Sequence, residues 1–260
     1  MTLTLGTGPL GRTDGAFNFD LQGSSPKHRL FLQPYGLRVR ASVGGAIVLD
    51  TVAAQLLHET GLPPRLYAPT GDFRVEALER TDTRTHCPFK GDASYWSLTV
   101  GGRTVPDAVW AYEDPLPAAP WLRGLAALDP QHVEAWFVED EQVTGGLRDP
   151  YHRVDAYPTS RPVEVLIDGE IVARTTNAVL VAETGLPPRA YVPAVDVQAP
   201  AGPGSGLRTV CPYKGEAAYW TVAGRQDVAW SYPFPLAGVA AIRGLWAFDD
   251  SVEGVEVRVG

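Results

Sequence analysis

The chain contains an internal repeat long enough to be a whole domain. The run Glu59–Arg65 recurs unchanged as Glu183–Arg189, at an offset of 124 residues. After Trp96 and its counterpart Trp220 the offset falls to 120, which indicates a hairpin that is four residues shorter in the second copy. Changes of this kind are tolerated at the tips of loops. Because solenoid units are much shorter, the sequence predicts a duplicated domain.

The repeat also suggests where the domains begin and end. We expect an N-terminal extension at residues 1–36, a first domain at 37–142, a linker at 143–160 and a second domain at 161–260. The linker is rich in Gly and Pro, as loop segments are. Two similar domains in one chain can pack as the subunits of a homodimer do, so we expect that the tandem domains form a pseudo-dimer.

Composition and charge disfavour several classes of partner. Hydrophobic residues make up 45% of the chain, which is enough for each copy to build a core. The net charge of -8 disfavours nucleic acids and anionic membrane surfaces, since both attract clustered Lys and Arg. No apolar stretch approaches the roughly 18 residues of a membrane span, and the N-terminus lacks the pattern of a signal peptide. We therefore expect an acidic, cytoplasmic protein with free thiols that binds neither nucleic acid nor membrane.

Both copies consist of short extended segments separated by turns. Residues 37–43 and 46–49 flank Gly44-Gly45, and Asp168-Gly169 provides the corresponding turn in the second copy, which predicts a hairpin in each. Residues 51–60 fit either a short helix or a strand. A strand is favoured because the counterpart in the second copy is richer in β-branched residues. The predicted fold is mainly β, with each domain a bent antiparallel sheet or a partly open barrel with little helix.

The most distinctive part of the repeat is the motif Cys-Pro-x-Lys-Gly, at residues 87–91 and 211–215. It holds both cysteines and two of the three lysines, in a chain with 19 arginines. Proline fixes φ and glycine permits a positive φ, so the motif predicts a stiff turn that presents a thiol and an ammonium. A nearby cation lowers the pKa of a thiol, which would make the cysteine reactive. In the alternative interpretation, the cysteine is buried and inert and the lysine stem only covers aromatic rings. The candidate catalytic residues are Cys87, Lys90, Cys211 and Lys214.

Aromatic and acidic residues recur around this motif. Ligand pockets are lined by aromatic side chains with a few polar groups, although Trp and Tyr also dominate ordinary cores. A buried glutamate needs a partner, and the lysine of the same copy is the candidate. His86 precedes Cys87 and could act as its base, but neighbours on a strand point to opposite faces. The candidate ligand-binding residues are Glu59, Tyr67, His86, Tyr95, Trp110, Tyr112, Glu183, Tyr191, Tyr219, Trp230 and Tyr232.

The sequence carries no strong signature of a metal or a cofactor. It has no Cys-x-x-Cys pair for zinc, no serine nucleophile elbow and no phosphate-binding loop. Residues 6–11 match the letters of a dinucleotide-binding fingerprint, but no strand–helix pattern surrounds them. We therefore expect no metal and no cofactor.

The recurring motifs resemble the domain-of-unknown-function 427 family, in a tandem arrangement. They are Glu-x-Gly-x-Pro-Pro with a following Tyr-x-Pro, Thr-x-Cys-Pro-x-Lys-Gly-x-Ala-x-Tyr, and Ala-Trp-x-Tyr with Pro-Leu. In this sequence they stand at Glu59–Pro69, Thr85–Tyr95, Trp110–Leu116, Glu183–Pro193, Thr209–Tyr219 and Ala229–Leu236. The resemblance implies a compact, mostly β domain and no established activity. A nucleotidyltransferase-like label is attached to the family, but this sequence has no Gly-Ser loop followed by paired aspartates.

Three functions are consistent with these patterns. The leading hypothesis is that each domain binds an unidentified small molecule at a pocket near its Cys-Pro-x-Lys-Gly turn, with thiol- or lysine-assisted catalysis as a further step. The first alternative is a scaffold or protein-interaction module in which the aromatic residues are core. The second is a nucleotidyltransferase-like activity, which the absent motifs disfavour.

Overall fold

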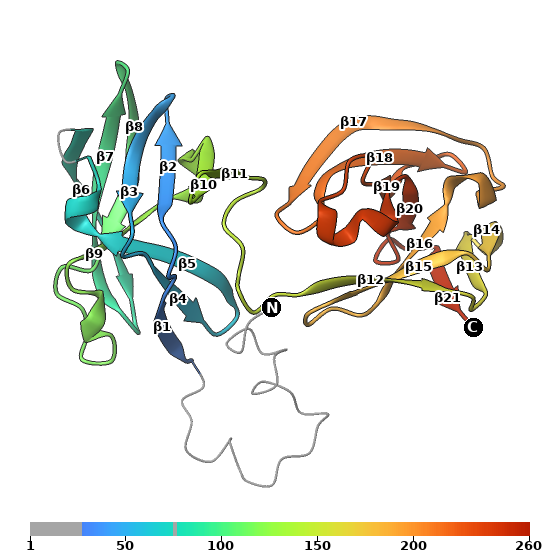
Figure 1. The fold of residues 1–260 in the computed structure, drawn as a ribbon, viewed down its shortest axis with the longest axis horizontal. Helices are drawn as coiled ribbons and strands as arrows, with labels where there is room; N and C mark the ends of the chain where they lie inside the picture. Colours follow the sequence, from blue (N-terminus) through green and yellow to red (C-terminus); the bar gives the residue numbers. More distant parts are fainter. Residues whose placement is uncertain (1–27, 75–76) are drawn as a thin grey trace, which may run out of the picture. The chain divides into compact units, whose positions relative to one another are not determined.

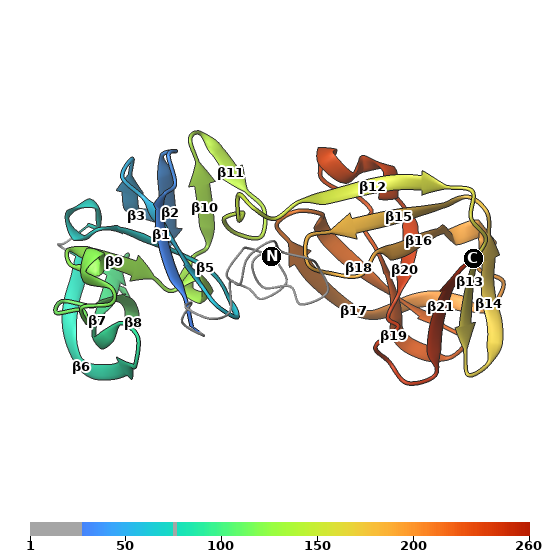
Figure 2. The same cartoon turned by 90° about the horizontal axis from the view of Figure 1, so that it is seen from below.

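The chain folds into two units of antiparallel strands, as the repeat predicts. The structure is a computed structural model that describes residues 28–74 and 77–260, and the boundary between the units falls between Asp149 and Pro150. Short 3-10 turns are the helical elements of this part of the chain. Strand β17 (Ala201–Cys211) curves strongly (Figure 1, Figure 2). Within the described residues, no helix has the length and apolar character needed to cross a bilayer. The prediction of a mainly β fold with little helix is confirmed.

The first domain consists of a seven-stranded sheet and a four-stranded sheet. The larger sheet has the order β1-β4-β5-β9-β8-β7-β6, and the smaller has the order β11-β10-β2-β3. The strands are β1 (Leu30–Pro34), β2 (Val39–Val43), β3 (Ala46–Thr51), β4 (Gln55–Glu59), β5 (Leu62–Pro69), β6 (Leu78–Cys87), β7 (Gly91–Val100), β8 (Arg103–Ala111), β9 (Leu125–Leu128), β10 (Ala135–Val138) and β11 (Glu141–Val143).

The second domain repeats this topology strand for strand in its larger sheet. That sheet has the order β12-β15-β16-β20-β19-β18-β17, and a smaller sheet has the order β14-β13-β21. The strands are β12 (Val154–Thr159), β13 (Val163–Ile167), β14 (Glu170–Thr175), β15 (Ala178–Glu183), β16 (Arg189–Pro193), β17 (Ala201–Cys211), β18 (Gly215–Val222), β19 (Arg225–Ser231), β20 (Leu245–Phe248) and β21 (Val255–Val259).

The first strand of each large sheet lies outside the domain bounds expected from the sequence. Strand β1 falls in the expected extension 1–36 and pairs with β4, while β12 falls in the expected linker 143–160 and pairs with β15. The bounds 37–142 and 161–260 therefore need correction, because each leaves out an edge strand of its own sheet. The two strands share little sequence with each other, so the repeat does not reveal them.

The predicted hairpins and the strand at residues 51–60 are present. Asp168 and Gly169 both have positive φ, at 52° and 86°, as a two-residue turn that follows the strand twist requires. The turn between β7 and β8 and the turn between β18 and β19 each contain two residues. The four residues missing from the second copy are therefore taken in equal parts from the two strands, not from the loop tip.

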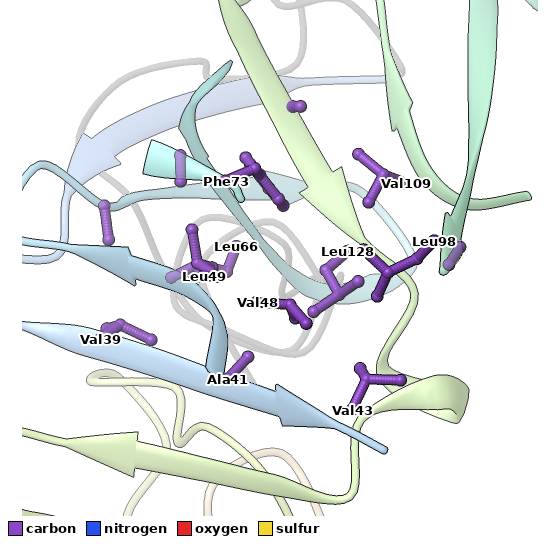
Figure 3. Close-up of a cluster of buried hydrophobic side chains, with 14 of the residues drawn as sticks. Val39, Ala41, Val43, Val48, Leu49, Leu66, Phe73, Leu98, Val109 and Leu128 are labelled. Atoms are coloured by element: carbon purple, nitrogen blue, oxygen red, sulfur yellow. The ribbon is translucent and has the colours of Figure 1, made fainter. Parts of the chain in front are cut away.

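Each large sheet buries both of its faces, and neighbouring residues alternate between them. In the first domain Leu66 and Val109 face the smaller sheet, where they pack with Val39 and Leu49 of β2 and β3 (Figure 3). The opposite side, which we call the inner face, is formed by Leu57, Tyr67, Ala93, Tyr112 and Ala127. The counterpart inner face of the second domain is formed by Val181, Tyr191, Ala217, Tyr232 and Ala247. Because strand residues alternate in direction, one sheet can serve as core on one side and carry a site on the other.

Candidate functional site

The Cys-Pro-x-Lys-Gly motif is the tight turn between β6 and β7. Cys87 and Gly91 pair across the hairpin, and the Lys90 N–H donates to the Cys87 carbonyl at 3.2 Å. Gly91 has a φ of 107°, where glycine is favoured. The Leu116 N–H donates to the Lys90 carbonyl at 2.9 Å, so the Pro-Leu pair that recurs with the motif lies beside the turn. The turn is therefore stiff, and its lysine is fixed at the backbone.

Alanine at Gly215, the counterpart of Gly91, will destabilise the second domain by about 1–3 kcal/mol. Gly215 has a φ of 106°, and an added Cβ would lie 3.1 Å from the Phe234 carbonyl oxygen. Gly71→Ala is the control, because an added Cβ there has nothing within 4 Å. Denaturant unfolding of the full chain measures both changes, and equal midpoints for the two variants would contradict the expectation.

The lysine of each turn pairs with the glutamate of the same domain, as the sequence suggested. Lys90 Nζ lies 2.5 Å from Glu59 Oε1, and the two side chains are only 9% and 7% exposed. Lys214 bonds Glu183 in the same way, with exposures of 12% and 13%. In the order of the first sheet, β5, β9 and β8 separate β4, which ends at Glu59, from the β6–β7 hairpin. The sheet must therefore bend around its inner face for the pair to meet.

A histidine completes the cluster in the second domain. His152 Nε2 lies 2.9 Å from Glu183 Oε1, while Lys214 donates to the other carboxylate oxygen, Oε2. The imidazole also contacts the ring of Tyr213, with 4.2 Å between centroids. His152 lies just before β12, so this cluster ties the first strand of the sheet to the lysine turn.

The first domain places a histidine in the corresponding position, but without the hydrogen bond that His152 makes to Glu183. His28 Nε2 lies 3.5 Å from Glu59 Oε2, and the imidazole stacks on Phe89 of the turn at 3.9 Å between centroids. His28 and His152 are separated by 124 residues, the offset of the repeat. The sequence therefore held a signal for these two histidines, but it was missed because both lie outside the expected domain bounds. We call each set of three residues the His–Glu–Lys cluster.

The cluster keeps the carboxyl of Glu183 ionised. Burial alone would raise the pKa of Glu183, but the hydrogen bonds and charges of Lys214 and His152 outweigh burial and lower this pKa below its ordinary value of 4.5. The carboxylate thus serves as a fixed acceptor between two donors.

This lowered pKa predicts a specific pH dependence. A carboxyl with a lowered folded-state pKa contributes stability above its unfolded-state pKa near 4.5, and the contribution is lost as pH falls through the folded-state value. The stability difference between wild type and Glu183→Gln will therefore be largest at neutral pH and shrink below about pH 4.5. Denaturant unfolding between about pH 7 and pH 3 tests this. If the stability difference between wild type and Glu183→Gln does not change with pH, the ionised form of Glu183 does not stabilise the fold.

A cavity opens beside the cluster on the inner face of the second domain. Its volume is about 330 Å³. Six of the candidate residues expected from the sequence meet there: Glu183, Tyr191, Lys214, Tyr219, Trp230 and Tyr232. The remaining lining residues, which were not singled out from the sequence, are Val181, Leu186, Pro187, Arg189 and Asp249.

Arg189 and Trp230 form one wall of this cavity. The guanidinium lies over the indole ring, 5.0 Å from its centroid. Its Nη1 donates to the Phe248 carbonyl at 2.7 Å and to Asp250 Oδ1 at 3.1 Å, which holds the side chain in place. Burial raises the pKa of the Tyr191 hydroxyl, while a hydrogen bond with Trp230 acts in the opposite direction. Tyr191 therefore remains neutral at physiological pH.

The lining of the cavity is nearly identical in the two repeats. Ten of the eleven lining residues have the same amino acid at the equivalent position of the first domain, and the exception is Val181, where the first domain has Leu57. The identical counterparts are Glu59, Leu62, Pro63, Arg65, Tyr67, Lys90, Tyr95, Trp110, Tyr112 and Asp129. In the first domain Trp110 Nε1 donates to the Tyr67 hydroxyl at 3.3 Å, and Arg65 lies over the indole ring.

The core on the opposite face of the sheets has changed much more. Leu49 corresponds to Ala173, and Ala126 corresponds to Trp246, all of them buried in their own domains. Side chains that only pack can change together if the total volume is kept. Because the cavity-lining residues have not changed in this way, packing alone does not account for their recurrence.

The two cysteines contribute packing to the site. Both thiols are free and half-buried. Cys87 and Cys211 pack against the inner-face hydrophobic residues of their domains, and Cys211 is not among the residues that line the second-domain cavity. In this position each cysteine packs as a small apolar residue, and a catalytic role for Cys87 or Cys211 stays a prediction.

His86 is not brought to the site. Its side chain is 64% exposed and its Nδ1 lies 2.6 Å from Asp92 Oδ1. It lines a separate depression with Arg84 and Glu113, whereas the adjacent Cys87 packs on the inner face. The expectation that His86 joins the ligand-binding residues therefore needs correction, because neighbouring residues on β6 point to opposite faces.

Comparison with protein families identifies the repeated domain. The model of a family described as a domain of unknown function (DUF427) matches residues 31–139 and 155–258. No curated protein matches the chain significantly. In the part of the chain that the structure describes, no group of three or more His, Cys, Asp or Glu residues is placed to hold a metal ion. Since the two matched segments cover most of both domains, the chain belongs to the DUF427 family and carries its domain twice.

Proposed function

We propose that the protein binds a small molecule in the cavity beside the Lys214–Glu183 pair, and that the Lys90–Glu59 pair marks the corresponding site of the first domain. The observation that supports this is the recurrence of ten of the eleven lining residues in domains whose cores have diverged. The volume of about 330 Å³ lies at the lower end of the range of ligand pockets, about 300–1,000 Å³. The lining is typical of such pockets, with aromatic walls and a few polar groups.

The geometry favours binding over catalysis by the thiol or the lysine. A lysine amine acts as a nucleophile when it has lost its proton, and Lys214 instead donates to an ionised carboxylate. Cys211 packs against apolar side chains and is absent from the cavity lining described above. We therefore propose that the cluster positions a hydrogen-bond donor for a ligand and does not form a covalent bond with it.

Blocking the cavity from its rim tests the proposed function. Leu186 lines the cavity and is 51% exposed, so Leu186→Trp can fill the space without disturbing the core. The full chain is incubated with a metabolite mixture, and retained compounds are identified by mass spectrometry after ultrafiltration. We expect that wild type retains a compound and that Leu186→Trp loses its second-domain binding.

The repeat provides a matched control for this experiment. Leu62→Trp makes the same change at the equivalent position of the first domain, where Leu62 is 48% exposed. It should leave binding to the second domain intact. Equal retention by wild type and Leu186→Trp, or retention of nothing by wild type, would contradict the proposed function.

A further inference from the structure

The carboxylate of Glu183 in the cavity of the second domain already accepts from two donors of the protein. Glu183 accepts from His152 through Oε1 and from Lys214 through Oε2. A ligand group that donates a hydrogen bond to Glu183 would therefore compete with His152 and Lys214 for the same carboxylate.

Donors, in contrast, remain available. An ammonium carries three N–H groups, and Lys214 gives one to Glu183. Among the described residues, the hydrogen bonds of the Arg189 side chain use only Nη1, which leaves Nε and Nη2. The Tyr232 hydroxyl makes no hydrogen bond to any residue that the structure describes. Two of these three donor groups are cationic.

Asp249 is the other acidic residue of the lining, and it has a separate role. Its Oδ1 accepts from the N–H and the hydroxyl of Ser251, at 3.1 and 2.5 Å, and so forms the turn after β20. Asp129 forms the same kind of turn in the first domain, where its Oδ1 accepts from the Gln131 N–H at 3.0 Å. Turn formation explains why this aspartate recurs without assigning it to the ligand.

We propose that the ligand of this cavity carries a carboxylate or a phosphate group on an apolar body. The anionic oxygens accept from Lys214, Arg189 and Tyr232. The body packs against the aromatic wall at Trp230 and against Leu186. Charge-assisted hydrogen bonds are about twice as strong as neutral ones, and a guanidinium fits such oxygens with two parallel donors. This inference rests on the proposed function, since it names the chemical class of ligand for the same site.

Four probes of one size test the proposal. Benzoate and phenyl phosphate carry the two anionic groups, benzamide carries a neutral acceptor, and benzylamine carries a cation. Each is titrated into the full chain while the indole N–H signal of Trp230 is followed by NMR. We expect saturable binding of at least one anion, at least tenfold tighter than that of benzamide or benzylamine. Which anion binds tighter distinguishes a carboxylate ligand from a phosphate ligand.

Three variants locate the binding. Arg189→Met should weaken anion binding at least tenfold, and Lys214→Arg, which keeps the charge, should weaken it less. Arg174→Met, which removes a second-domain arginine that bonds Glu164 away from the cavity, should change nothing. Equal loss of binding in Arg174→Met would mean that the anion responds to general charge and would overturn the proposal.

The outcomes separate this inference from the proposed function. If benzamide or benzylamine binds as tightly as the anions, the cavity binds small molecules but the anionic class is wrong. If no probe binds while Leu186→Trp still removes a compound captured from the metabolite mixture, the anionic class is overturned and the proposed function stands. If neither experiment detects binding at the cavity, both are overturned.

Discussion

Replacing Lys90 by methionine will lower the stability of the first domain by about 3–5 kcal/mol, because it leaves the carboxylate of Glu59 buried without its partner. Glu59 is only 5% exposed, so water cannot replace the lost ammonium. Methionine keeps the apolar stem, so the loss reports on the charge and not on packing. Lys214→Met will act on the second domain in the same direction, with a smaller loss because Glu183 and Lys214 are more exposed.

Lysine-to-arginine changes at the two positions provide the comparison. Arginine restores the charge but has a planar fork in place of a compact ammonium, so Lys90→Arg and Lys214→Arg should lie between wild type and the methionine variants. Denaturant unfolding of the full chain measures the loss, and hydrogen exchange assigns it to one domain. If all four variants unfold as wild type does, the lysines are solvated and the cluster does not hold the site together.

Trp246→Ala will lower the stability of the second domain by about 3–5 kcal/mol, through the cavity that it leaves in the core. Trp246 is 8% exposed, and its ring stacks on Trp220 with 4.6 Å between centroids. Phe234→Ala is the matched control, since Phe234 is 84% exposed and should change the stability by less than about 0.5 kcal/mol. Equal unfolding midpoints for Trp246→Ala and Phe234→Ala would contradict this description of the core.

The strands that the sequence predicted well are those with local turn signals. The hairpin of β13 and β14 follows from Asp168-Gly169, which supplies the positive φ values of its turn. Strands β1 and β12 have no such signal. An edge strand is defined by the neighbour with which it pairs, here β4 and β15, and that pairing comes from the tertiary fold.

The site could be predicted from the sequence only in part. The pairing of Glu59 with Lys90 followed from a charged residue in an apolar segment, which needs a partner when buried. Arg189 was missed although it ends a run that recurs unchanged, because an arginine in a Pro-rich segment resembles ordinary surface charge. Only the structure places its guanidinium over Trp230. The bending of the sheet, which brings distant strands together, has no signature in either repeat alone.

The most direct test of the central claim is a crystal structure of the full chain soaked in the metabolite mixture. The claim is that the recurring residues of the cavity lining form a ligand site. We expect electron density for a compound in the second-domain cavity, in contact with Lys214, Arg189 and Trp230. A cavity that contains only water after soaking, in crystals where the same mixture can reach it through open solvent channels, would contradict the claim.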